Sequence, residues 1–166
     1  TDIVRTGENE FFVLEDNART PSGVSYMLEN RETMLQMFPE LFSQIKVQRV
    51  SDYPKNLRRS LAACAPQGCS GKPTVAILTP GIHNSAYFEH SFLSQQMGVE
   101  LVEGQDLTVR NGEVYQKKLA GLEPVEALFR QIDDLDSDPF TLRRATPYGV
   151  AGLIQVCRDQ NIDVTN

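Results

Sequence analysis

The chain has 166 residues, of which 40% are hydrophobic, and this is enough to bury one sizeable core or two small ones. Its formal net charge is −6 and its sequence pI is about 4.9, which argues against a general nucleic-acid binder or a membrane-surface protein. No apolar run approaches the roughly 20 residues that a membrane helix needs, and no basic-then-apolar leader opens the sequence.

The first segment predicts a β-hairpin. Residues 1–6 and 10–16 are both typical of strands, and Gly7 permits the chain reversal between them. Because Thr1 falls inside the first of these strands, we expect the chain to be a piece of a longer protein.

Two helices are expected after the hairpin. An apolar stripe predicts a helix over 25–37, with Ser25 as its N-cap and Pro39 as its stop. A second helix is expected to begin after Pro54. It ends in the stretch 65–73, whose Gly, Pro and Ser content predicts a linker.

Beyond the linker the pattern is that of a parallel sheet. The run "TVAILT" (74–79) is continuously apolar, as in a strand that is covered on both faces. A helix over about 84–97 and a strand over 99–102 follow it, and together they form a strand–helix–strand unit. Residues 126–133 predict a third strand of this sheet.

The last elements complete an α/β prediction. Residues 107–117 predict a hairpin that turns at Asn111-Gly112, 147–160 a helix with Pro in its first turn, and 162–165 a further strand. We therefore predict an N-terminal hairpin with helices, then a Rossmann-like α/β layer that carries an appended hairpin.

Oxygen-bearing side chains gather where the second strand ends. Glu15 and Asn17 are two residues apart and project from one face of an extended chain, and the hairpin can bring Asp2 beside them. With Arg19 close by, this set suits Mg²⁺ and phosphate. The alternative is a solvated strand end with an Asx turn into Pro21. The continuation Arg-Thr-Pro-Ser-Gly-Val-Ser adds a charge and two hydroxyls on a rigid turn, which favours the metal–phosphate interpretation.

Two long strings carry a family resemblance. "VLEDNARTPSGVSYMLENR" and, downstream, "LTPGIHNSAYFEHSFLSQQMGVELVEGQDL" resemble the circularly permuted ATP-grasp proteins (type 2) related to glutathionylspermidine synthetase. The resemblance implies that residues 1–64 are part of an ATP-grasp catalytic subdomain with its metal-binding strands. It implies that 74–166 form the Rossmann-like pre-ATP-grasp domain. The cofactors it implies are ATP and Mg²⁺, although the glycine-rich loop and the lysines that hold ATP are not evident in these 166 residues.

The resemblance also implies roles for single residues. The magnesium ligands would be Asp2, Glu15 and Asn17, with Asp16 at the variable middle position and facing away. The residues that handle the transferred phosphoryl group or the acceptor carboxylate would be Arg5, Arg19 and Ser22.

A second polar group follows the strand at 74–79, where open α/β sheets usually bind ligands. The substrate-binding residues expected there and nearby are Ser25, Asn84, Ser85, Tyr87, Glu89, His90 and Arg130. The structural alternative makes Asn84 or Ser85 an N-cap, Tyr87 a packing residue and His90 a helix-surface residue. Arg130 and Asp133 either line this edge or simply pair with each other.

The function implied by the resemblance is an ATP-dependent carboxylate–amine ligase that acts through an acyl phosphate. Its partners would be ATP, a small carboxylate and an amine, with no nucleic acid and no membrane. The alternative is a non-catalytic α/β domain that binds a small molecule or a protein. Under either hypothesis we expect a cytoplasmic protein with three free thiols, and an inactive isolated 166-residue chain.

Overall fold

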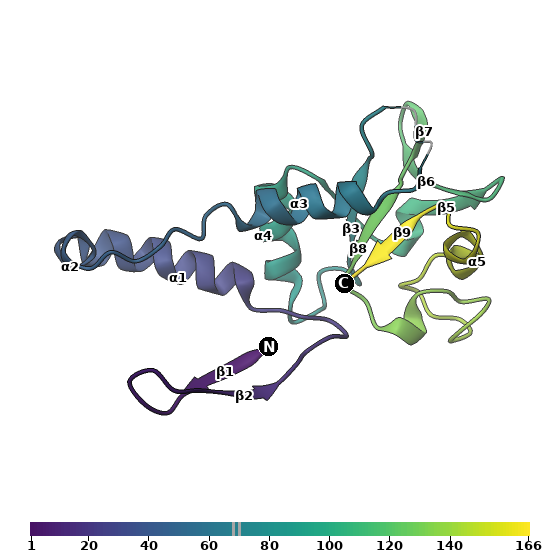
Figure 1. The fold of residues 1–166 in the computed structure, drawn as a ribbon. Helices are drawn as coiled ribbons and strands as arrows, with labels where there is room; N and C mark the ends of the chain where they lie inside the picture. The colour runs from purple at the N-terminus through teal and green to yellow at the C-terminus, as the bar shows by residue number, and fades with distance from the viewer. Residues whose placement is uncertain (68, 70) are drawn as a thin grey trace.

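A computed structural model describes residues 1–67, 69 and 71–166 (Figure 1). Its elements in chain order are β1 (Asp2–Arg5), β2 (Phe11–Glu15), α1 (Val24–Met37), α2 (Pro39–Gln44), α3 (Tyr53–Cys64), β3 (Val75–Leu78), α4 (Tyr87–Met97), β4 (Glu100–Val102), η1 (Gly104–Asp106), β5 (Leu107–Arg110), β6 (Glu113–Lys118), β7 (Gly121–Pro124), β8 (Ala127–Arg130), η2 (Asp134–Asp136), α5 (Leu153–Arg158) and β9 (Asp163–Thr165). Residues 68 and 70 of the predicted linker lie outside the described residues.

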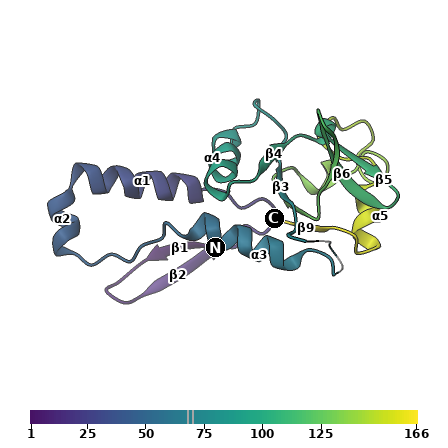
Figure 2. The same ribbon diagram turned by 90° about the horizontal axis from the view of Figure 1, so that it is seen from above.

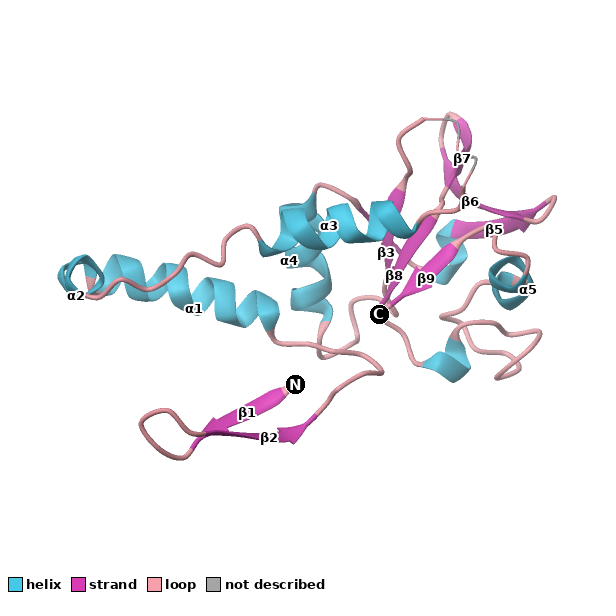
Figure 3. Ribbon diagram, in the orientation of Figure 1, coloured by secondary structure: helices cyan, strands magenta, loops and turns pink. Residues whose placement is uncertain are grey.

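A four-stranded parallel sheet forms the centre of the α/β layer. Its strand order is β4-β3-β8-β9, and β3 and β8 are buried along their whole length. Alternation along β3 sends Val75 and Ile77 to one face, where they pack with α3 and α4. Ala76 and Leu78 point to the other face and pack with α5 and the second sheet. The continuous apolar run is therefore explained by cover on both faces, as Figure 3 shows.

The strands and helix of this layer confirm the sequence prediction, with one shift. The predicted strands at 74–79, 99–102 and 126–133 are β3, β4 and β8, and the predicted strand at 162–165 is β9. Helix α4 begins at Tyr87 and not at 84, because residues 84–86 form a turn.

The predicted helix over 147–160 is wrong in its first half. Only Leu153–Arg158 are helical, and α5 begins after Gly152, which has φ +85°. The preceding residues follow a loop around the buried carboxylate of Asp138, which accepts hydrogen bonds from the backbone N–H groups of Gly152 and Ile154 at 3.2 and 3.1 Å. A tertiary partner therefore overrides the local helical pattern.

The appended hairpin turns where it was predicted to turn. Asn111 and Gly112 have φ +52° and +77°, as a two-residue turn with both residues left-handed requires. A third strand, β7, pairs antiparallel with β6 and makes a three-stranded sheet, which the sequence prediction missed.

Helices α1 and α2 form an arm that extends from the α/β layer (Figure 2). The base of α1 packs on α4, where the rings of Tyr26 and Phe88 lie 5.3 Å apart. One detail of the prediction was wrong, since the N-cap is not Ser25 but Gly23, which has φ +108°. The predicted stop is confirmed, because α1 ends at Met37 just before Pro39, and Pro39 itself begins α2.

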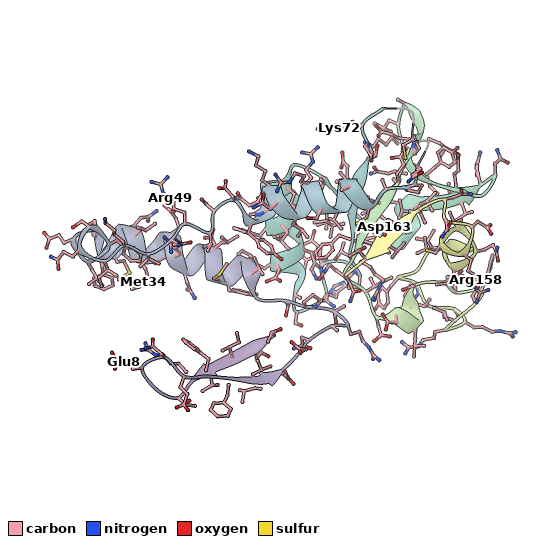
Figure 4. The ribbon with its side chains drawn as sticks, in the orientation of Figure 1. Glu8, Met34, Arg49, Lys72, Arg158 and Asp163 are labelled. Carbon is pink, nitrogen blue, oxygen red and sulfur yellow. The ribbon has the colours of Figure 1, made fainter. Side chains whose placement is uncertain are left out.

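Strands β1 and β2 form the predicted antiparallel hairpin, which lies apart from the sheet in Figure 1. Figure 4 shows Glu8 at its outer end and side chains on both sides of its strands. Its large apolar residues are 41–67% exposed, namely Ile3, Val4, Phe11, Phe12, Val13 and Leu14. A two-stranded hairpin is marginally stable alone, and an exposed apolar surface such as that of β1 and β2 is typical of surfaces that pack against other protein.

Candidate functional site

The start of β1 and the end of β2 bring two carboxylates together. Asp2 and Glu15 are partners in the antiparallel register, at a point where the register shifts between Asp2 and Ile3 as in a β-bulge. The Asn17 Nδ2 donates to Glu15 Oε1 at 3.4 Å, so this amide lies on the same side. Asp16 instead accepts a hydrogen bond from the Thr1 hydroxyl. The two carboxylates and the amide are therefore neighbours, and the residue between Glu15 and Asn17 has a different partner.

These side chains fit a hard divalent cation. Mg²⁺ takes oxygen ligands and is commonly held by one or two carboxylates plus substrate oxygens. Among the described residues no group of three or more Asp, Glu, His or Cys side chains is placed to hold a metal, so an ion here would use two carboxylates and the Asn17 amide oxygen. The assignment of Asp2, Glu15 and Asn17 as metal ligands stays a prediction.

Arg5 is not brought to this cluster. Alternation along β1 puts it on the opposite face from Asp2. Its guanidinium donates to the carbonyl groups of Gly7 and Glu8 at 2.8 and 2.6 Å, so it holds the hairpin turn. The phosphoryl-handling role predicted for Arg5 has no support from this geometry.

The segment after β2 runs across the carboxyl edge of the parallel sheet. The carbonyl of Arg19 accepts a hydrogen bond from Arg130 Nη2 at 3.3 Å. The exposed Arg19 guanidinium lies 3.4 Å from a carboxylate oxygen of Asp134 and 3.8 Å from one of Asp133. The buried Arg130 pairs at 2.5 Å with Asp134, so the predicted alternative of an Arg130–Asp133 pair is replaced by an Arg130–Asp134 pair.

Glu89 fixes the other end of this segment. Its carboxylate is 2% exposed and accepts hydrogen bonds from Gly23 N at 2.6 Å and from Ser25 Oγ at 2.6 Å. It therefore satisfies free donors at the start of α1, where a negative charge also complements the helix dipole. Ser25, which is fully buried, serves the same contact. The structure thus gives both residues a positioning task in place of the open contact with substrate that the sequence suggested.

A cavity of about 430 Å³ opens beside this segment. Its lining residues are Thr20, Ser22, Pro80, His83, Asn84, Ser85, Ala86, His90, Gln131, Ile132, Asp133, Asp136 and Tyr148. It lies where β3 and β8 end. The helix after β3 packs on one face of the sheet and the helix after β8 on the other, so this is the switch point at which open α/β sheets bind ligands.

Four of the predicted residues line this cavity, namely Ser22, Asn84, Ser85 and His90, whereas Tyr87 does not. Asn84 Oδ1 accepts the N–H of Ala86 at 2.8 Å, which closes a turn before α4. The N-cap of α4 is Ala86, so neither Asn84 nor Ser85 is the cap. His90 is 2% exposed, which rules out the surface position that the structural alternative gave it.

His90 is held by a defined partner. Its Nδ1 lies 2.9 Å from the hydroxyl of Thr79, and that hydroxyl also accepts the N–H of Gly81 at 3.2 Å. Thr79 is 1% exposed, and Nδ1 is the acceptor available for its hydroxyl hydrogen among the described residues. Burial lowers the pKa of His90, and the nearby Glu89 charge offsets this only in part. A neutral ring with its proton on Nε2 follows.

Sequence reasoning missed Gln131. It follows β8 directly, is 6% exposed and lines the cavity, and its Nε2 has no hydrogen-bond partner among the described residues. The available signal was its place at the end of a buried strand, beside the end of β3.

The far wall of the cavity depends on a loop built around Asp138. This fully buried carboxylate also accepts the N–H of Phe140 at 2.8 Å. Burial raises its pKa, but the backbone donors outweigh burial and the net shift is downward. In the same loop the Arg143 guanidinium lies 2.9 Å from Asp136, which lines the cavity. The cavity wall is therefore fixed by ionised carboxylates.

The structure is that of an α/β protein with a cavity at the carboxyl edge of its parallel sheet and an oxygen-rich strand pair before it in the chain. The chain belongs to the circularly permuted ATP-grasp type 2 family, whose model matches residues 1–166. The resemblance of the two strings is thereby confirmed. Among the described residues, no helix has the length and apolarity needed to cross a membrane.

Relatives of this chain are longer proteins. An uncharacterized protein of Synechocystis is 49% identical over 166 residues, which cover 100% of this chain and 34% of that protein. An uncharacterized protein of Mycobacterium tuberculosis is 48% identical over 161 residues, or 97% of this chain and 29% of that protein. A Frankia casuarinae protein named "Putative glutamate--cysteine ligase 2-2" is 37% identical over 99% of this chain and 19% of its own length. The chain thus spans about a third or less of these relatives.

Proposed function

We propose that this chain is part of an ATP-dependent carboxylate–amine ligase that acts through an acyl phosphate. Family membership and the ligase name of a relative support a ligase-type protein. The observation that carries the proposal is the register pair of Asp2 and Glu15, two carboxylates that lie just before the segment that leads to the cavity.

In this proposal Asp2, Glu15 and Asn17 hold Mg²⁺, which would neutralise the phosphate oxygens of ATP. A carboxylate oxygen of the substrate attacks the γ-phosphorus of ATP, which breaks its bond to the β-phosphate oxygen and releases ADP. An amine then attacks the carbonyl carbon of the acyl phosphate, loses a proton and displaces inorganic phosphate. Phosphoryl transfer depends on positioning and charge neutralisation, so no nucleophilic side chain is required. Arg19 follows β2 in the chain. It can stabilise the negative charge that develops on the transferred phosphoryl group once it exchanges its contacts with Asp133 and Asp134 for that group.

The proposed division of the chain follows the family resemblance. Residues 1–64 belong to an ATP-grasp catalytic subdomain and 74–166 form the pre-ATP-grasp domain. Residues 65–73 are the linker between them. Helix α3 nevertheless packs on β3 and β8 through Leu61, so the end of the first unit contributes to the core of the second. Movement between the two units would therefore occur before α3.

The test is ADP release by the full-length protein with Mg²⁺, screened against amino acids and small peptides. Glu15→Gln is expected to reduce magnesium-dependent turnover at least a hundredfold, since one metal ligand loses its charge. Asp16→Asn is the matched control, because it removes a neighbouring charge that has a different partner. Equal turnover in the two variants would remove the metal assignment, and ligand binding without any turnover would favour the non-catalytic binding domain.

A further inference from the structure

The cavity at the ends of β3 and β8 has a polar lining without cationic Lys or Arg side chains among its described residues. Asp133 and Asp136 contribute carboxylates to this lining. Phosphate and carboxylate ligands are usually held by cationic side chains or charged donors. The lining therefore disfavours a phosphate, and the nucleotide must be bound elsewhere.

Two buried side chains offer N–H donors at this cavity. His90 is neutral with its proton on Nε2, since Thr79 occupies Nδ1, and Nε2 has no partner among the described residues. Gln131 has an amide nitrogen without a partner. Buried polar groups are nearly always paired, so a group left open beside a cavity is available to bond with a ligand or with water.

The same cavity is also lined by two carboxylates, which can accept hydrogen bonds. One oxygen of Asp133 accepts the N–H of Leu135 at 2.9 Å, while its side chain is 40% exposed and its other oxygen lies 3.8 Å from Arg19. Asp136 is bound by Arg143, which leaves it less free. An amide both accepts and donates hydrogen bonds, so it complements a cavity lined by the donors Gln131 and His90 and the acceptor Asp133.

We propose that this cavity binds the amide group of a small neutral amide or peptide, with Gln131 and His90 donating to its carbonyl oxygen and Asp133 accepting its N–H. Thr79 is a positioning residue that fixes the His90 tautomer. The volume of about 430 Å³ is in the usual range for small-molecule sites. That this is the substrate pocket rests on the ligase function proposed above, whereas amide binding itself does not.

The test measures binding of N-acetylglycinamide to the full-length protein without ATP, by saturation-transfer NMR titration. The variants are Gln131→Met and His90→Phe. Gln116→Met is the matched control, because Gln116 is another buried glutamine with an unpartnered atom and it is not among the lining residues. We expect each cavity variant to weaken binding roughly 3- to 10-fold, as the loss of one neutral hydrogen bond requires, and the control to bind like the wild type.

A second measurement separates a binding role from a structural one. Because Gln131 leaves a buried polar atom unpaired in the unliganded protein, Gln131→Met should melt no lower than the wild type while it binds more weakly. Equal affinity in wild type, Gln131→Met and His90→Phe would overturn the proposal. So would absent binding of the probe, tighter binding of inorganic phosphate or glycine in competition, or weaker binding by Gln131→Met that accompanies a lower melting temperature of that variant. Since no arm uses ATP, failure here is distinguishable from failure of the ADP-release test.

Discussion

Glu89 offers the sharpest test of how the site is positioned. Glu89→Gln keeps the shape of the side chain and removes its charge. In the structure the carboxylate accepts bonds from Gly23 N and from the Ser25 hydroxyl, both at 2.6 Å, and a longer one from Ser25 N at 3.4 Å. All three donors reach the same oxygen, Oε2, while Gly23 N also lies 2.8 Å from Oε1. A glutamine with its carbonyl oxygen at the Oε2 position keeps these donors, but the bonds to a charged carboxylate become bonds to a neutral amide, and its NH₂ faces Gly23 N.

The expected cost follows from these contacts. A hydrogen bond to a charged group contributes about 1.5–3 kcal/mol and a neutral one about 0.5–1.5 kcal/mol, while an unsatisfied buried donor costs about 1–3 kcal/mol. Turning the two short charged bonds into neutral ones therefore destabilises the start of α1 by about 2 kcal/mol. Because 1.4 kcal/mol is a factor of ten, a loss of about 2 kcal/mol makes local opening roughly 30-fold more frequent.

The assay is hydrogen exchange by mass spectrometry on peptides that cover residues 23–28 of the full-length protein. Glu100→Gln is the control, since Glu100 is exposed and its contact with Lys118 is a surface ion pair of little weight. Exchange in these peptides should accelerate in Glu89→Gln and stay unchanged in Glu100→Gln. If both variants exchange alike, Glu89 does not hold the start of α1 and the reasoning fails.

Three further outcomes are expected. His90 binds a proton more readily in the unfolded chain, at its ordinary pKa of 6.5, than in the fold, so stability should fall as pH drops below about 6.5, and His90→Phe should flatten that slope in urea titrations. Asp138→Asn should lower the stability of the cavity wall by about 2–4 kcal/mol at neutral pH, visible as faster hydrogen exchange over 138–154, because an amide replaces a carboxylate among backbone donors. Gly149→Ala should cost about 3 kcal/mol or more in thermal unfolding, since its Cβ would lie 2.1 Å from the carbonyl oxygen of Asp136, whereas Gly7→Ala meets only a flexible side chain and should cost much less.

The parts of the fold that the sequence predicts are those set by local pattern. The run at 74–79, the Gly98 stop and the Asn111-Gly112 turn each depend on neighbouring residues, and each is found as expected. The start of α5 was missed because the helical pattern over 147–152 is overridden by Asp138, which lies 14 residues before Gly152.

Of the candidate site, the contact between Glu15 and Asn17 was predictable from the sequence, because it needs only an extended backbone at the end of β2. Their role as metal ligands stays a prediction. The role of Glu89 as acceptor at the start of α1 could not be predicted, because the donors that it satisfies lie 64 and 66 residues away in sequence. Gln131 was missed for a related reason. A buried amide without a partner is recognised only when everything around it is known.

The hydrogen bond between Gly23 N and the Glu89 carboxylate can form only after residue 89 has been synthesised. Gly23 leaves the ribosome before Glu89, and at about 5–20 residues per second the interval is about 3–13 s for the 66 residues between them. Arg130, which donates a hydrogen bond to the Arg19 carbonyl, is synthesised later still, 111 residues after Arg19. During that time the segment between β2 and α1 lacks the two contacts that hold its ends in the folded chain. Ribosome-bound chains stalled before and after residue 89 should therefore differ in how readily proteases cut between β2 and α1.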